Sequence, residues 1–443
     1  MAEIPNRRWT ELTDHDREQL RLLLVDALAL AAAGTASQDA QQVLAGLGAV
    51  GHGEVRVPWT DLRLSAPAAV VAISTLIHAW DFDDTHDEAV VHTASVVVPT
   101  VLAAAATAGA NGVSVADGLV TGVHLLSRLA RVTGPRTGVI RTAGLGSLAA
   151  AAAAATVWGL PDDKVQHAVA LSLGAALAPG TRQAVVDGSV AKRIQPGLAA
   201  QFGITAAALA AQGVEGPSGW LSGDFGLAPG SGVSWDDLFT GDFEGRWVAV
   251  KPYPACRYTH AALAAAESLR DRHPHWDEVE QVRVHVPEGS AYSLVARPYQ
   301  DRGVPLVDAQ FSIPWQLAAL WVTGRYDLTT LHGGDLGNPA IAAAAARITV
   351  VQDLPESSVM TGARVEVRTT DGARAAAEAP MPGAGGTTWA ALTRKAGSCL
   401  RVGAHADPDH AVAELRQLAD RLPGLDAPAL AAALDHSTTT PRP

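Results

Sequence analysis

The hydrophobic positions in the first part of the chain repeat with the spacing of helices. Apolar runs follow Ser, Thr, Asp or Asn and are closed by glycine, as at helix starts and ends. The predicted helices span residues 17–33, 38–47, 66–79, 95–108, 114–133, 145–157, 162–177, 197–212 and 259–272. Several are apolar on every side, which is typical of helices buried inside a bundle.

The pattern changes near residue 275. Residues 279–286 alternate strictly between apolar and polar side chains, which predicts a half-buried strand. The later elements predicted are strands at 347–351, 363–369 and 373–378 and helices at 313–322, 339–346, 387–400, 408–421 and 427–435. Asp371-Gly372 is a hairpin signal between the last two strands.

A chain of 443 residues is too long for one compact core, so we expect more than one domain. The order of elements predicts a mostly α fold, with a large all-helical domain and a smaller α+β domain. We expect residues 1–268 to form the first part of the helical domain and 269–385 the α+β domain. Residues 386–443 would then return to the helical domain.

The densest cluster of ionisable side chains lies between two of these apolar helices, in residues 78–92. Its members are His78, Asp81, Asp83, Asp84, His86, Asp87, Glu88 and His92. Burying such groups is costly unless they are paired, so the cluster is a candidate site. The alternative, weighted equally on this stretch alone, is a turn whose Asp residues cap helix ends.

Charge and composition argue against several classes of partner. A net charge of −12 disfavours nucleic acid and anionic membranes. The longest apolar run, residues 148–158, is too short to span a bilayer, and the first residues lack the apolar core of a signal peptide. Two cysteines suit a reducing cytoplasm. Metal-ligand and dinucleotide-binding motifs do not occur, so the motifs support neither a metal site nor a dinucleotide cofactor.

Lysine is rare in this chain. It occurs only at Lys164, Lys192, Lys251 and Lys395, while arginine supplies the other basic positions. Lysine has a compact ammonium that can lose its proton, which is one functional reason to retain it. The alternative is that the four positions reflect sequence drift without a functional cause. Lys164 follows a helix start and should be exposed.

Five segments in order carry a family resemblance. They are Leu22–Gly34, His78–Thr85, Gly188–Ala200, Lys251–His260 and Ala309–Trp315. Together they resemble the MmgE/PrpD family, which includes 2-methylcitrate dehydratases, cis-aconitate decarboxylases and related lyases and epimerases. The resemblance implies a helical domain, a smaller lid domain and a homodimer without metal or organic cofactor.

The resemblance also assigns roles to individual residues. Elimination or decarboxylation next to a carboxylate needs a base, an acid and cations that hold anionic oxygens. The acidic signature carries over as Asp81 and Thr85, the next family histidine as His92, and the two family lysines as Lys192 and Lys251. His92 could be the general base or acid, with a backbone-bonded helix-start histidine as the alternative.

Other residues are candidates for substrate binding. Arg141, Arg193 and Arg257 could each hold a carboxylate, or could equally be ordinary ion-pair residues. His260 either belongs to the site or only caps a helix. Four positions depart from the family pattern: Ile140 and Gln195 stand where histidines are often found, Cys256 where some decarboxylases have histidine, and Trp315 where they have tyrosine.

The leading functional prediction is a cofactor-independent lyase, a dehydratase or decarboxylase. It would act next to a carboxylate or carbonyl of a small anionic metabolite other than 2-methylcitrate. One alternative is an isomerase, epimerase or cyclase that uses the same pocket. Another is a non-catalytic protein that keeps the anion pocket after losing part of its acid–base set.

Overall fold

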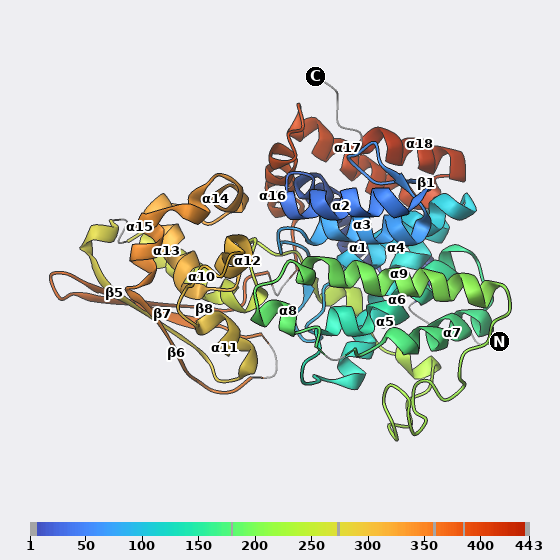
Figure 1. Ribbon diagram of the computed structural model, residues 1–443, viewed down its shortest axis with the longest axis horizontal. Coiled ribbons are helices and arrows are strands. Elements are labelled where there is room, and N and C mark those ends of the chain that lie inside the picture. The colour runs from blue at the N-terminus through green and yellow to red at the C-terminus, as the bar shows by residue number, and fades with distance from the viewer. Residues whose placement is uncertain (1–6, 179, 273–274, 358–359, 384–385, 439–443) are drawn as a thin grey trace. The chain divides into compact units, whose positions relative to one another are not determined.

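The computed structural model describes residues 7–178, 180–272, 275–357, 360–383 and 386–438. The chain divides into two compact units (Figure 1). Unit 1 comprises Met1–Gln183, Ala191–Val250 and Gly385–Pro443, and unit 2 comprises Ala184–Val190 and Lys251–Ala384. Most of unit 2 is therefore one continuous segment that starts at Lys251.

Unit 1 is a helical bundle, as predicted. Its helices are α1 (Asp14–Gly34), α2 (Gln38–Val50), α3 (Ala66–His78), α4 (Ala94–Ala108), α5 (Gly112–Thr133), α6 (Arg141–Val157), α7 (Asp162–Leu171), α9 (Ala191–Ala211), α16 (Trp389–Val402), α17 (Pro408–Arg421) and α18 (Ala427–Ser437). The short α8 (Gln183–Val186) lies at the unit boundary. Most boundaries agree with the sequence pattern within a few residues, because polar caps and glycines mark them.

Helix α6 forms the centre of the bundle and packs against α5, α7, α4 and α9. Its residues 148–155 are fully buried, and seven of them are alanines. Small side chains allow the backbones to approach closely, and Gly203 of α9 shows how closely. A Cβ at Gly203 would lie 2.4 Å from the carbonyl oxygen of Ser147, so only glycine fits there.

Helix α9 starts at Ala191 rather than at residue 197 as predicted. The proline at position 196 favoured the later start, because proline cannot donate its backbone nitrogen to the carbonyl four residues earlier. The helix nevertheless continues through Pro196. Lys192 and Arg193 therefore lie in its first turn, and both are buried.

Two short strand pairs complete the described part of unit 1, and the sequence pattern revealed neither. β1 (His52–Arg56) pairs with β2 (Arg63–Leu64), and β3 (Thr85–His86) pairs with β4 (Val248–Ala249). Strands of two residues carry no readable alternation. The second pair is important because β3 lies inside the acidic cluster.

Unit 2 contains a four-stranded sheet in the order β6-β5-β7-β8. The strands are β5 (Val279–Pro287), β6 (Ile348–Leu354), β7 (Ala363–Thr369) and β8 (Arg374–Ala379). β5 is parallel to β6 and antiparallel to β7, and β7 and β8 form the predicted hairpin. All four strand predictions are confirmed, because each predicted segment pairs within this sheet.

The helices of unit 2 include several that the sequence pattern did not reveal. The described helices of this unit are α10 (His260–Arg270), α11 (Ser290–Ala296), α12 (Pro305–Gln310), α13 (Ile313–Thr323), α14 (Leu328–His332) and α15 (Pro339–Ala345). The sequence pattern predicted α10, α13 and α15 and missed α11, α12 and α14. α10 packs on β7 and β8, while α11 and α13 contact β6. The fold is therefore mostly α with a smaller α+β unit, as expected.

Short 3-10 turns connect many of these elements. They span Trp9–Glu11, Ser172–Ala175, Asp236–Phe239, Glu244–Trp247, Arg257–Thr259, Trp276–Glu278, Asp335–Gly337 and Leu422–Gly424. One of them replaces the end of the helix predicted at 162–177, because the α-helical bonding of α7 stops at Leu171.

One helix among the described residues, α9, has the length and apolar composition of a membrane span, and the bent pair α1 and α2 would pass the same test together. Half of the apolar window of α9 is buried against its own unit. A helix packed in a protein core has the same composition, so this finding is weak evidence for a membrane span.

Candidate active site

The acidic loop, defined as residues 79–84, connects α3 to β3 and is buried throughout. Asp81 adopts a φ of 50°, a left-handed conformation that is uncommon for a residue with a side chain. Such strain persists where the surroundings hold it, and functional sites often show it. The side chains of Asp81, Asp83 and Asp84 are all withdrawn from solvent.

The ammonium of Lys192 lies at the centre of the polar cluster. Its Nζ is 3.0 Å from Oδ1 of Asp81 and 3.1 Å from Nε2 of His78. The other ring nitrogen of His78, Nδ1, is 2.8 Å from Oδ1 of Asp83. These contacts form a chain from Asp83 through His78 and Lys192 to Asp81, supplied by α3, the acidic loop and α9.

The contacts of His78 define its protonation. Nδ1–H donates to Asp83, and Nε2 accepts from the Lys192 ammonium, so the imidazole is neutral. Burial and the charge of the nearby Lys192 lower the pKa of His78 to about 4, against Asp83 and Asp81, which raise it. A neutral His78 next to a charged Lys192 is the arrangement that burial favours.

Arg193 provides a second cation for the same carboxylate. Its Nη1 lies 3.5 Å from Oδ2 of Asp81, and the guanidinium is buried. Asp81 thus lies between two cations from the first turn of α9. The carboxylate positions these cations, which agrees with the orienting role predicted for Asp81.

His92 adjoins this chain and is the more accessible histidine, with 16% of its side chain exposed. Its Nδ1 lies 2.7 Å from the carbonyl oxygen of Asp84 and 3.4 Å from Oγ1 of Thr85. Because Nδ1–H donates to that carbonyl, Nε2 is the proton-accepting nitrogen of the neutral ring. The His92 and His78 rings are 5.1 Å apart.

Asp84 has a structural part in the cluster. Its carboxylate accepts hydrogen bonds from the backbone N–H and hydroxyl of Thr93 and from the N–H of Ala94, at the start of α4. Burial and the charge of Asp83 raise the pKa of Asp84 to about 7, against these donors, which lower it. The helix-capping alternative for the cluster therefore holds for Asp84, whereas Asp81 and Asp83 bind Lys192 and His78.

A second buried network fixes the far end of the segment. Nε2 of His86 lies 3.1 Å from Oε2 of Glu244, and Arg131 lies 2.8 Å from Oε1 of the same carboxylate. Although burial opposes ionisation, the hydrogen bond from His86 and the nearby Arg131 lower the pKa of Glu244 to about 2. The network anchors β3 and therefore Thr85.

Most candidate residues of unit 2 are buried, and two of them, Arg257 and His260, contact each other. Lys251, Arg257, His260 and Trp315 are buried, and Cys256 is partly exposed. Nη1 of Arg257 lies 3.2 Å from Nδ1 of His260, whose Nε2 lies 3.2 Å from the carbonyl oxygen of Ala255. Arg257 donates and the carbonyl accepts, so His260 is a neutral ring at the start of α10 rather than only an end-capping group.

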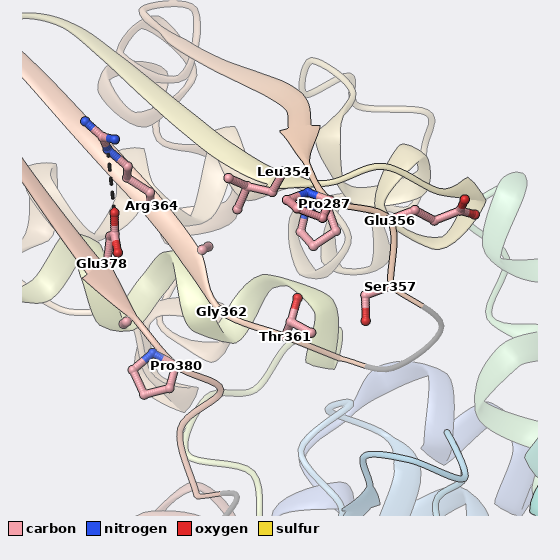
Figure 2. A pocket seen from close by; sticks show the side chains of 12 residues that line it. Pro287, Leu354, Glu356, Ser357, Thr361, Gly362, Arg364, Glu378 and Pro380 are labelled. Carbon is pink, nitrogen blue, oxygen red and sulfur yellow. Dashed lines mark ion pairs between the residues drawn. The ribbon is translucent and has the colours of Figure 1, made fainter.

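Unit 2 also contains a hollow of about 600 Å³ at one end of its sheet (Figure 2). It is lined by Pro287, Leu354, Pro355, Glu356, Ser357, Thr361, Gly362, Ala363, Arg364, Glu378, Ala379 and Pro380. Its charged groups include Arg364 and Glu378, which are 4.0 Å apart and partly neutralise each other. None of the candidate residues lines this hollow.

Three ligand-type groups lie close enough together to suggest a metal site. Ligand atoms of His78, Asp81 and His92 all lie within 4.8 Å of one another. The Lys192 ammonium, however, contacts both His78 and Asp81. The cluster therefore carries its own cation, and a divalent ion there would face a positive charge.

Comparison with known proteins places this geometry in a family. The family model described as the MmgE/PrpD N-terminal domain matches residues 4–232, and that of the MmgE/PrpD C-terminal domain matches residues 253–418. The chain belongs to the MmgE/PrpD family. The predicted resemblance is thereby confirmed.

Three curated relatives illustrate this membership. Cis-aconitate decarboxylase of Aspergillus terreus is 26% identical over 399 residues, which covers 80% of this chain and 78% of that protein. The cis-aconitate decarboxylase-like protein oryM of Aspergillus oryzae is 26% identical, covering 70% of each chain. Cis-aconitate decarboxylase of Homo sapiens is 25% identical, covering 63% of this chain and 60% of that protein. Decarboxylases are lyases, so membership in this family supports a lyase.

Two of the four positions that depart from the expected MmgE/PrpD pattern, Ile140 and Gln195, contact the same residue. The backbone N–H of Ile140 donates to Oγ1 of Thr181 at 2.8 Å, and Nε2 of Gln195 donates to the Thr181 carbonyl at 2.9 Å. Arg141, the first residue of α6, donates to the carbonyl of Ala89 at 2.7 Å. Ile140 and Gln195, which stand where the family often has histidines, therefore both form a hydrogen bond with Thr181, near the starts of α6 and α9.

Sequence reasoning left two central groups without a role. His78 and Asp83 were seen only as members of the cluster, although they complete the chain of contacts to Lys192. Their five-residue separation was a usable signal, since a histidine ending a helix often meets the polar residues that follow. Lys164 was expected to be exposed, but it is half-buried and donates to the carbonyl of Ala211.

Proposed function

We propose that this chain is a cofactor-independent lyase that decarboxylates or dehydrates a small anionic metabolite next to a carboxylate. The observation that carries the proposal is the buried Asp83–His78–Lys192–Asp81 chain with His92 beside it. It offers cations for anionic oxygens and proton carriers within one cluster. Lyase chemistry of this kind requires both.

The residues divide the chemistry between them. Lys192 and Arg193 stabilise carboxylate and developing enolate oxygens, while Asp81 holds both cations in place. Nε2 of His92 takes or gives the proton at carbon. In a decarboxylation, the C–C bond breaks, CO2 leaves, and the electron pair on the remaining carbon accepts a proton from His92 or Lys192. Thr85 and the Asp84 carbonyl orient the His92 ring.

The proposed substrate class rests on the charges of the cluster and on the two nearby positions that depart from the family pattern. Two cations favour a substrate with at least one carboxylate, as with the acid named for the curated relatives. Ile140 and Gln195 cannot move a proton where the family often has histidines. We therefore propose a related acid or carbonyl compound, different from 2-methylcitrate, as the preferred substrate.

Lys251, Arg257, Cys256, His260 and Trp315 are proposed as further substrate contacts from unit 2. This part of the proposal rests on the motif match in the segment 251–260. We also propose a cytoplasmic homodimer, from the family resemblance and the sparse cysteines.

A substrate panel tests the proposal. Purified protein is incubated with cis-aconitate, citrate, 2-methylcitrate and related unsaturated or hydroxylated acids, and NMR follows substrate loss. Depletion with release of CO2 or water supports the lyase, and the variants Lys192→Ala and His92→Ala should abolish it. Unchanged turnover in both variants would refute the site assignment.

Two alternatives give different results in the same samples. An epimerase or cyclase would conserve substrate mass, and an epimerase would exchange a carbon-bound proton for deuterium from the solvent. A non-catalytic anion-binding protein would bind a panel acid in calorimetry without turnover. The intact proton carriers His92 and Lys192 favour the lyase over this last alternative.

A further inference from the structure

Lys395 is a buried lysine with no part in the proposed chemistry. It lies on α16, and its ammonium donates to Oδ2 of Asp26 at 2.9 Å and to the carbonyl of Phe82 at 2.6 Å. Oδ1 of Asp26 is 2.8 Å from the same nitrogen. The ammonium also lies over the Phe82 ring, 4.1 Å from its centre.

The place of Phe82 gives this contact its significance. Phe82 stands between Asp81, which binds Lys192, and Asp83, which binds His78. Its carbonyl belongs to the short stretch in which Asp81 takes a φ of 50°. A fixed carbonyl at Phe82 therefore restrains the directions in which both carboxylates point.

We infer that Lys395, neutralised by Asp26, is a positioning residue that holds the acidic loop in its working conformation. Asp26 lies on α1, so the ion pair ties the loop to two helices of the bundle. Trp80 provides a second tie, because its Nε1 donates to the α1 carbonyl of Ala33 at 2.8 Å. With both ties in place, the strained Asp81 stays aimed at Lys192.

The chemistry of lysine suits this role. Its compact ammonium directs three donors from one point, whereas the planar guanidinium of arginine is larger and forked. Among the four lysines, Lys192, Lys251 and Lys395 are buried. The retention of lysine in a chain rich in arginine is thus explained at position 395 by geometry, without proton transfer.

The test uses the paired variant Asp26→Asn/Lys395→Met, which leaves neither charge buried without its partner. Hydrogen–deuterium exchange followed by mass spectrometry should show exchange about tenfold or more faster in residues 79–87. Peptides from α5 and α6 should keep the exchange of the unmodified protein. Equal exchange in residues 79–87, or acceleration spread uniformly over unit 1, would overturn the inference.

A matched control removes another ion pair of unit 1. Arg7, which precedes the 3-10 turn Trp9–Glu11, and Asp162, the first residue of α7, form a partly buried ion pair outside the acidic loop. The variant Arg7→Met/Asp162→Asn should lower the melting temperature without selective acceleration in residues 79–87. If this control also loosens the loop, the effect belongs to general stability and the positioning role is refuted.

A second variant covers the case in which the paired variant does not fold. Lys395→Arg keeps a positive charge for Asp26 but cannot place its donors at the same point. Selective acceleration in residues 79–87 is expected here too, and exchange identical to that of the unmodified protein would overturn the inference.

The inference rests on the proposed function only where it calls the loop conformation the working one, that is, the one needed for catalysis. With a panel acid that the unmodified enzyme turns over, kcat should fall by about 10–100-fold in the paired variant while KM changes little. A merely structural residue would leave kcat per folded molecule unchanged. If no acid is turned over, the proposed function fails, and the exchange measurement still decides the role of Lys395.

Discussion

The Nζ atom of Lys192 lies 3.1 Å from Nε2 of His78, although both are basic groups. Such proximity is stable only when one of them is neutral, and burial makes His78 the neutral partner. The negative charges of Asp81 and Asp83 lie at the two ends of this contact. The pair can therefore exchange a proton internally while the cluster keeps its total charge.

Lys192 should be essential for turnover. We expect Lys192→Met to lower kcat by about 10²–10⁴-fold, because it removes a cation and a proton carrier. Arg193 remains to balance Asp81, so the unfolding free energy should fall by less than about 3 kcal/mol. Steady-state kinetics and urea denaturation check both values. Lys164→Met, on α7, is the matched control and should leave kcat unchanged.

His92 should carry the proton at carbon. The variant His92→Asn keeps a polar side chain but cannot act as a base near neutral pH, so kcat should fall by about 10²–10⁴-fold. Thr85→Val should have a smaller effect, since the Asp84 carbonyl still orients the ring. Near-normal turnover in His92→Asn would contradict this role and would assign the proton transfer to Lys192.

Two buried histidines should make the stability of the fold sensitive to acid. Burial lowers the pKa of His78 and His124 to about 4, below the usual 6.5. The unfolded chain therefore binds more protons than the folded chain between these values, so stability is lost as pH falls from about 6.5 toward 4. Each histidine accounts for a loss of roughly 3 kcal/mol over this window, whereas Asp84, whose pKa burial raises to about 7, acts in the opposite direction.

His124 allows this to be tested away from the site. It donates from Nε2 to the carbonyl of Leu238 and accepts at Nδ1 from the N–H of Glu244. In the variant His124→Gln, the loss of unfolding free energy on going from pH 7 to pH 5 should be smaller by about 2 kcal/mol than in the unmodified protein. Urea titrations at the two pH values measure it. A variant with the full acid sensitivity would contradict the assignment.

Cys256 should report on substrate binding. Burial raises the pKa of the Cys399 thiol to about 12, so it should not react with iodoacetamide in the native protein. Cys256 is partly exposed and should be the thiol that reacts. A panel acid that binds near Cys256 should slow this alkylation, measured by mass spectrometry with Cys256→Ser as control. Alkylation at an unchanged rate under saturating acid would remove Cys256 from the site.

The sequence allowed the fold to be predicted better than the site. Helices such as α17 and strands such as β5 can be predicted from local periodicity and capping residues, which depend on neighbouring residues only. The contact between Lys192 and Asp81 joins residues 111 positions apart, and that between Lys395 and Asp26 joins residues 369 apart. Local patterns carry no information about such pairings.

The family resemblance supplied part of what periodicity could not. It brought Asp81, Thr85, His92 and Lys192 together in advance, and the structure places all four within one unit. It said nothing about which nitrogen of His92 bears the proton. That detail follows from the Asp84 carbonyl, a backbone atom whose position depends on the turn after α3.

The alanine-filled interior of α6 has a consequence for how this enzyme could acquire new chemistry. Larger side chains in residues 149–155 would collide with the surrounding helices, so the middle of the bundle tolerates little change. Ile140 and Gln195, by contrast, lie at the beginnings of α6 and α9, where half-exposed positions accept substitution. Selection can therefore exchange acid–base groups at helix starts while leaving the scaffold intact, and a directed-evolution library would best be confined to those positions.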